Sequence, residues 1–113
     1  MSARRNVEIV RIWFRRLAAG DYACMHELQT RDVVWDCIDG ASTGTVPWLG
    51  RFRGRKGVDR CLSRFAAAVE TETFELDAFL TDGRNKVAVP GRCRLRERTT
   101  GRHFSIDFVE YFE

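Results

Sequence analysis

The N-terminal part of the chain has the apolar periodicity of amphipathic helices. In the first segment the apolar residues recur every three or four positions and the arginines occupy the other side, with the apolar stripe at Val10, Trp13, Phe14 and Leu17. With Asn6 as its N-cap, this segment predicts a helix of about 13 residues. Gly20 then predicts a helix stop, and Asp21 a cap for a short second helix from Tyr22 to about Leu28.

The pattern then changes to a strand, a turn and a third helix. Residues 33–38 are mostly apolar and predict a strand that places Trp35 and Cys37 on one face and Asp36 on the other. Asp39 and Gly40 predict a turn, and residues 41–49 predict either a small hairpin or an ordered loop. A loop over residues 50–57 and a helix over about residues 57–69 follow, the helix with an apolar stripe at Val58, Cys61, Leu62, Phe65, Ala68 and Val69.

Three runs with strand-like alternation complete the chain. Residues 73–81 alternate, with Phe74, Leu76, Ala78 and Leu80 on one face, and residues 86–98 alternate apolar residues with arginines. In the last run one face carries Phe104, Ile106, Phe108, Glu110 and Phe112. Helices in the first half and strands in the second predict an α+β fold, and a length of 113 residues fits a single domain over residues 1–113.

Composition narrows the class of protein. At 44% hydrophobic residues the chain can fill a core. It has no apolar leader and no run of about 18 apolar residues, so we expect a cytoplasmic protein without a membrane span. Its cysteines lack Cys-x-x-Cys spacing and no cluster of histidines lies beside them, which predicts no metal site, and each falls within an apolar pattern, which predicts buried, reduced thiols: Cys24, Cys37, Cys61 and Cys93.

Two groups of arginines raise the question of an anionic partner. The basic loop over residues 50–57 could hold an anion at a helix N-terminus or could simply be solvated. Arginines at every second position from Arg92 to Arg98 could face nucleic acid or could pair with acids such as Glu75 and Asp77. A net charge of only +3 and the absence of aromatic residues between these arginines favour pairing over nucleic-acid binding.

Glu110 is the clearest candidate for chemistry. It occupies one position among four large apolar residues on the same face of the last predicted strand. Such a carboxyl group either reaches water at the end of the sheet or has a raised pKa and can donate a hydrogen bond to a developing oxyanion. Asp36 and Asp39 are candidate bases, although Asp39 also fits a plain turn residue. The two histidines lie far from any candidate nucleophile in the pattern, so nucleophilic catalysis is not predicted.

The order of elements, with Ala-Ala-Gly-Asp, Asp-Val-Val-Trp, Pro-Trp-Leu-Gly-Arg-Phe-Arg-Gly-Arg-Lys-Gly-Val and a Thr-Gly-Arg turn, resembles the SnoaL-like, ketosteroid-isomerase-like group of the nuclear-transport-factor-2-like superfamily. The resemblance covers essentially the whole chain. It implies a cone in which a curved, mostly antiparallel sheet wraps around three helices and encloses an apolar pocket. It also implies dimers and a cofactor-free reaction.

The resemblance implies that this chain keeps only some of the residues of the ketosteroid isomerase site. Its oxyanion-hole tyrosine corresponds to Trp13 and its protonated aspartate to Glu110, whereas the position of its base is occupied by Cys37, next to Asp36. We therefore expect catalytic roles for Glu110, Trp13, Asp36 and Asp39. The residues expected to contact a substrate are Trp35, Cys37, Trp48, Tyr22, Phe65 and Phe108.

These observations leave two hypotheses of function. The first is an isomerase- or cyclase-type enzyme that moves a proton next to a carbonyl group of a small apolar molecule. The second is a non-catalytic dimeric module that binds a ligand or a protein. The family usually has one more strand after the position of Glu113, so we also expect an exposed sheet edge and a homodimer or larger homo-oligomer.

Overall fold

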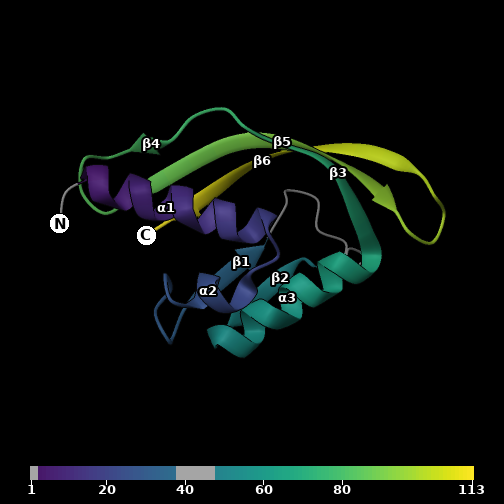
Figure 1. Cartoon of the computed structure of the whole chain (residues 1–113), viewed down its shortest axis with the longest axis horizontal. Helices are drawn as coiled ribbons and strands as arrows, with labels where there is room; N and C mark the ends of the chain where they lie inside the picture. Colours follow the sequence, from purple (N-terminus) through teal and green to yellow (C-terminus); the bar gives the residue numbers. More distant parts are fainter. Residues whose placement is uncertain (1–2, 38–47) are drawn as a thin grey trace.

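The computed structural model describes residues 3–37 and 48–113 and forms an α+β fold in which the helices lie on one side of a long curved sheet (Figure 1). The predicted turn at Asp39 and most of the segment 41–49 lie outside the described residues. The elements in chain order are α1 (Ala3–Ala18), α2 (Tyr22–His26), β1 (Val34–Cys37), β2 (Gly50–Arg53), α3 (Gly54–Ala68), β3 (Val69–Leu76), β4 (Leu80–Thr81), β5 (Val87–Glu97) and β6 (His103–Phe112). No helix in the described ranges is long and apolar enough to cross a membrane.

The first helix packs against the sheet through the predicted apolar stripe. Val10, Trp13 and Phe14 are buried in α1. The predicted N-cap is wrong, because α1 already includes Asn6, whose side-chain amide instead donates a hydrogen bond of 2.8 Å to the Arg84 carbonyl oxygen. The second cap is confirmed: the Asp21 carboxylate accepts a hydrogen bond of 3.3 Å from the Cys24 backbone N–H, and α2 ends two residues earlier than predicted.

The predicted basic loop is partly a strand. Residues 50–53 form β2, which pairs antiparallel with β1 so that Trp35 lies opposite Phe52. The chain then turns directly into α3 at Gly54, whose positive φ of 68° suits glycine. Phe52 is buried, whereas its neighbours Arg51 and Arg53 are exposed. The sequence did not reveal this alternation because the segment is rich in arginine and glycine.

The large sheet is antiparallel in every pairing that the structure describes, with β5 between β6 on one side and β3 and β4 on the other. The buried face of β5 is as predicted. The predicted strand over residues 73–81 is instead divided, because β3 begins directly after α3 and the chain leaves the sheet between Leu76 and Leu80. This break reverses the alternation, so that Phe79 packs in the core and Leu80 is exposed.

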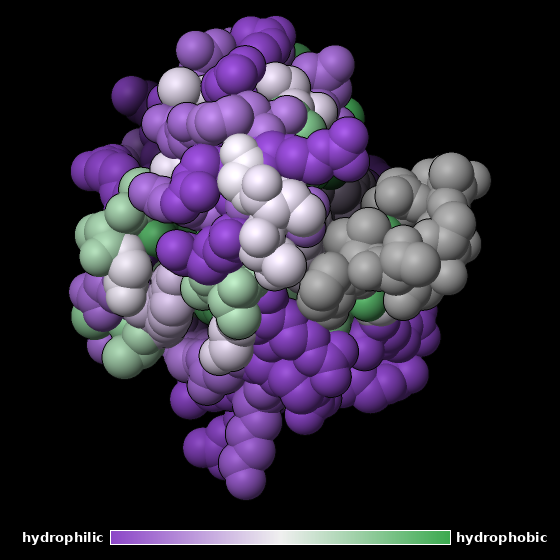
Figure 2. Space-filling view, turned by 90° about the vertical axis from the view of Figure 1, so that its right-hand side faces the viewer, coloured by the Kyte–Doolittle hydropathy of each residue, from purple (hydrophilic) through white to green (hydrophobic). Residues whose placement is uncertain are grey.

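The outer face of the sheet is a ladder of ion pairs. Arg92 pairs with both Glu75 and Asp77, as predicted, at 3.3 and 3.0 Å. Arg96 pairs with Glu70 at 3.1 Å. Figure 2 shows that the end of the molecule near the β5–β6 hairpin is mostly hydrophilic. Arg94 pairs with Glu72 at 3.6 Å, so the first three arginines of the row neutralise neighbouring acids, whereas Arg98 donates a hydrogen bond of 2.8 Å to the Ala66 carbonyl oxygen.

The apolar core is divided into two clusters under the sheet. The first cluster lies under α1 and α2 and has its buried members at Val10, Trp13, Phe14, Met25, Val87 and Val89. The second lies at the other end of the sheet, around Val69, Cys93 and Leu95. On β6, Phe112 packs against the first cluster and Phe108 against the second, with Glu110 between them.

Candidate functional site

An open cavity of about 2140 Å³ lies between the helices and the inner face of the sheet. Its walls come from α1, the β1 strand, α3 and the two long strands β5 and β6. The predicted site residues that the structure describes all line this cavity: Trp13, Tyr22, Trp35, Asp36, Cys37, Trp48, Phe65, Phe108 and Glu110. Asp39, the remaining predicted residue, lies outside the described part of the chain. The cavity thus brings residues from both ends of the sequence to one place.

Glu110 introduces a carboxyl group between two apolar clusters. It lies opposite Val89 in the β5–β6 pairing, on the same face as Phe108 and Phe112. The side chain as a whole is exposed to the open cavity. The protein nevertheless reduces the hydration of the carboxyl group, and this desolvation raises the pKa of Glu110 above its ordinary value. The strand alternation that identified the residue in the sequence also explains this position.

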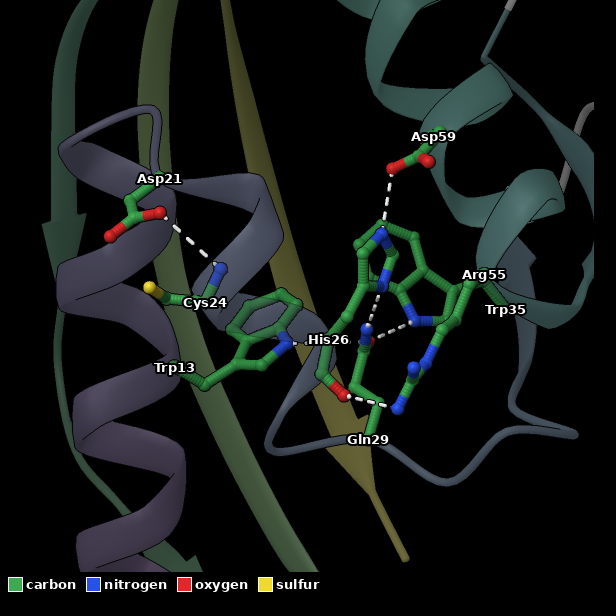
Figure 3. A network of polar contacts seen from close by, with 8 residues as sticks. All are labelled: Trp13, Asp21, Cys24, His26, Gln29, Trp35, Arg55 and Asp59. Carbon is green, nitrogen blue, oxygen red and sulfur yellow. Dashed lines mark hydrogen bonds and ion pairs between the residues drawn. The ribbon is translucent and has the colours of Figure 1, made fainter.

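The Trp13 indole, which the sequence predicted as an oxyanion-hole donor, already has a hydrogen-bond partner (Figure 3). Its N–H donates to the Gln29 side-chain oxygen at 3.4 Å, and the Trp35 indole N–H donates to the same oxygen at 2.9 Å. Gln29 therefore fixes the relative position of two aromatic walls of the cavity. The amide lies in the turn after α2, and no sequence pattern distinguishes it from an ordinary loop glutamine.

The other end of the Gln29 amide continues this network to α3. Its nitrogen lies 3.3 Å from His26 Nδ1, and His26 Nε2 lies 2.8 Å from Asp59. Because the amide oxygen accepts from both indoles, the amide nitrogen must donate to His26 Nδ1. His26 Nε2–H then donates to Asp59, which defines a neutral tautomer. The chain Asp59–His26–Gln29 thus links α3 to the two indoles, and Arg55 adds a hydrogen bond of 3.1 Å to the His26 carbonyl oxygen.

Asp36, a candidate base, is held by an ion pair. Arg51 on the paired strand β2 contacts both carboxylate oxygens, at 2.6 and 3.0 Å. This hydrogen bonding to Arg51 lowers the pKa of Asp36. A lowered pKa makes the carboxylate a weaker base, so the geometry favours Glu110 over Asp36 for proton transfer.

Three thiols line the same cavity as Glu110 and lie within reach of its charge. Cys37 and Cys93 line the cavity, and Cys61 on α3 faces it beside them. The Glu110 charge contributes to the elevated pKa of Cys93, after the larger effect of burial. The four cysteines are free, but only two are fully buried, so the prediction of buried thiols holds for Cys61 and Cys93 and is wrong for the half-buried Cys24 and Cys37. Within residues 3–37 and 48–113, no three His, Cys, Asp or Glu side chains converge in a metal-binding arrangement.

Solved structures share this architecture. An NTF2-like protein from Burkholderia xenovorans is 26% identical with a TM-score of 0.82 over 98% of this chain and 80% of its own. TerC, co-crystallised with polyporic acid, is 18% identical with a TM-score of 0.74, over 94% of this chain and 78% of its own. A candidate polyketide cyclase from Xanthomonas campestris is 16% identical with a TM-score of 0.71, over 97% and 81%.

No curated protein matches this chain. The family model of the SnoaL-like domain, in contrast, matches residues 10–113, from the middle of α1 through β6. This match and the shared α+β architecture agree with the resemblance seen in the sequence. The chain belongs to the SnoaL-like domain family of the NTF2-like fold.

Proposed function

We propose that this protein binds a small apolar carbonyl compound in its cavity and catalyses isomerase- or cyclase-type proton transfer next to the carbonyl group. The observation that carries the proposal is the position of Glu110, a carboxyl group with a raised pKa at the junction of two apolar clusters in the cavity wall. A candidate polyketide cyclase and a protein co-crystallised with polyporic acid have the same fold, which agrees with a cavity for ring compounds.

Glu110 can act in two ways at such a carbonyl group. In its protonated form it donates a hydrogen bond to the carbonyl oxygen, and this bond strengthens as negative charge develops there. In its ionised form it accepts the proton of the neighbouring carbon and can return it to a second atom of the same substrate. Because the pKa of Glu110 is raised, its protonated form persists to higher pH than in an ordinary glutamate, and no cofactor is consumed in such a transfer.

A deuterium-exchange assay tests the reaction without requiring the natural substrate. Cyclic ketones, steroids and polyketide-like aromatic compounds are incubated with the protein in D₂O, and NMR follows the loss of the proton next to the carbonyl group. Binding is measured in parallel by thermal shift, since a ligand at about 100 times its Kd adds roughly 2.7 kcal/mol to stability. We expect exchange for at least one compound with the wild type and its loss in Glu110→Gln.

Glu75→Gln provides the matched control. It makes the same chemical change on the outer face of the sheet, where Glu75 pairs with Arg92 and does not line the cavity. Exchange that persists in Glu110→Gln, or that is lost equally in Glu75→Gln, would contradict the assignment of Glu110.

A second candidate function is the non-catalytic, dimeric ligand- or protein-binding module. Two observations favour it: the Trp13 N–H is engaged by Gln29, and Asp36 is engaged by Arg51. Both groups expected to assist Glu110 therefore have partners within the protein. Tight binding of a carbonyl compound without any exchange of the adjacent proton would favour this second function.

A further inference from the structure

Two thiols from different elements meet in the cavity wall. Cys37 ends β1 and Cys61 lies in the buried stripe of α3, 24 residues later, and their sulfur atoms are 3.7 Å apart. Both side chains line the cavity. The Cys61 thiol also lies 3.7 Å from the Trp48 carbonyl oxygen, to which it can donate.

This separation is small enough for a covalent link. A disulfide has a sulfur–sulfur distance of about 2.05 Å, so the two atoms must approach by roughly 1.7 Å. Rotation of two side chains can supply a movement of this size. In contrast, Cys24 follows the cap of α2 and does not line the cavity.

The pair also has an electrostatic asymmetry that favours a thiolate, the reactive form in thiol oxidation, at one of the two sulfurs. The hydrogen bond between the two thiols lowers the pKa of Cys61 and raises the pKa of Cys37. One sulfur is thus favoured as a thiolate while the other keeps its proton. The Glu110 carboxylate opposes ionisation of both thiols.

We propose that Cys37 and Cys61 form an oxidisable pair that a peroxide converts into a disulfide between β1 and α3. The first thiolate, favoured at Cys61, attacks one peroxide oxygen, the O–O bond breaks, and the departing oxygen takes up a proton and leaves as water. The second sulfur then attacks the resulting sulfenic acid, its hydroxyl group leaves as a second water molecule, and the S–S bond forms. Two thiols and one hydrogen peroxide thus give one disulfide and two water molecules.

The disulfide would change the cavity beside Glu110. It removes the Cys61 S–H that can donate to the Trp48 carbonyl oxygen. It also links β1 covalently to α3, the elements that precede and follow β2 in the chain. Oxidation therefore modifies the wall of the proposed binding site. The chemistry of the pair does not depend on the proposed function, because it needs no ligand.

Peptide mapping of the folded full-length protein tests the pair. The protein is treated with hydrogen peroxide, the remaining thiols are alkylated, and the digest is analysed by mass spectrometry with and without dithiothreitol. We expect a Cys37–Cys61 cross-link that dithiothreitol reverses, in the wild type and in the matched control Cys24→Ser. Neither Cys37→Ser nor Cys61→Ser should form it, and in both variants the remaining sulfur should stop at the sulfenic or sulfinic acid.

Absence of the Cys37–Cys61 peptide from folded, oxidised protein would overturn the proposal. So would a mixture in which Cys24 and Cys93 are cross-linked as often as the pair, because random pairing indicates oxidation of unfolded chains. Circular dichroism before digestion verifies that each variant is folded.

The oxidation rate gives a second, independent readout. Glu110→Gln removes the negative charge that raises the thiol pKa values, so at a fixed pH it should increase the thiolate fraction and the rate of cross-linking. Glu75→Gln, on the outer face, should leave the rate unchanged. An equal or slower rate in Glu110→Gln would contradict the placement of the pair in the field of Glu110.

Discussion

Replacing Gln29 by methionine should destabilise the protein through loss of one shared hydrogen-bonding group. The variant keeps the length of the side chain and removes its amide. The Trp13 and Trp35 indole N–H groups then lose their acceptor, and His26 Nδ1 loses its donor. Trp13 is 6% exposed, so water cannot easily replace the lost acceptor at that position.

The lengths of these hydrogen bonds determine how large the loss of stability should be. An intramolecular hydrogen bond contributes about 1 kcal/mol, and an unsatisfied buried donor costs about 1–3 kcal/mol. Only the Trp35 bond, at 2.9 Å, is short, whereas the bonds at 3.4 and 3.3 Å are long and weaker. We therefore expect a total loss of roughly 2 kcal/mol. For a chain of 113 residues this corresponds to a decrease in Tm of about 8 °C.

Urea unfolding and thermal unfolding measure the loss of stability, and a double-mutant cycle shows how much of it comes from the Trp35–Gln29 hydrogen bond. Trp35→Phe keeps an aromatic ring and removes the N–H, so Gln29→Met should cost about 1 kcal/mol less in the Trp35→Phe background than in the wild type. A cost of Gln29→Met below about 0.5 kcal/mol would refute the role of the amide. Strict additivity of the two substitutions would refute the Trp35–Gln29 bond.

Two further substitutions test the sheet. Desolvation raises the pKa of Glu110 in the folded state. At pH values above the usual glutamate pKa of about 4.3, the unfolded chain therefore binds fewer protons than the folded protein. The stability of the wild type consequently falls as the pH rises towards the folded pKa. Glu110→Gln should therefore gain stability relative to the wild type as the pH rises between these two pKa values. Urea unfolding at a series of pH values measures this gain, and a stability difference that does not change with pH would contradict the prediction. Gly91→Ala should cost about 1–3 kcal/mol, because the added methyl group would overlap the Glu75 carbonyl oxygen and the Phe108 ring. Unfolding within about 0.5 kcal/mol of the wild type would show that β3 moves aside freely.

The alternation of apolar and polar residues was sufficient to predict most of the large sheet. In β5 the period of two is uninterrupted, and on β6 the apolar residues at alternate positions are half-buried, so the sequence alone placed Glu110 on the face that they share, although Glu110 itself is exposed. The pairing of Arg92 with acids of the neighbouring strand followed from the same periodicity. These predictions succeeded because each depends on geometry within one or two adjacent strands.

Elements whose local signals were ambiguous were predicted less well. The strand β2 was interpreted as a loop, since four residues with two arginines and a glycine carry only one apolar residue, Phe52. The break between Leu76 and Leu80 was missed because the alternation of apolar residues continues through it in the sequence. The assembly, the cytoplasmic location and the substrate stay predictions.

By itself, the sequence determined the α+β class, the order of most elements and the one carboxyl group on the inner face of β6, because secondary-structure periodicity is encoded over short stretches. Only the tertiary structure decided how the site residues are engaged. The partners of Asp36, Trp13 and Cys37 lie 15, 16 and 24 residues away, at Arg51, Gln29 and Cys61. Such contacts depend on how strands and helices pack against one another, and no local sequence pattern predicts which side chains then meet across the cavity.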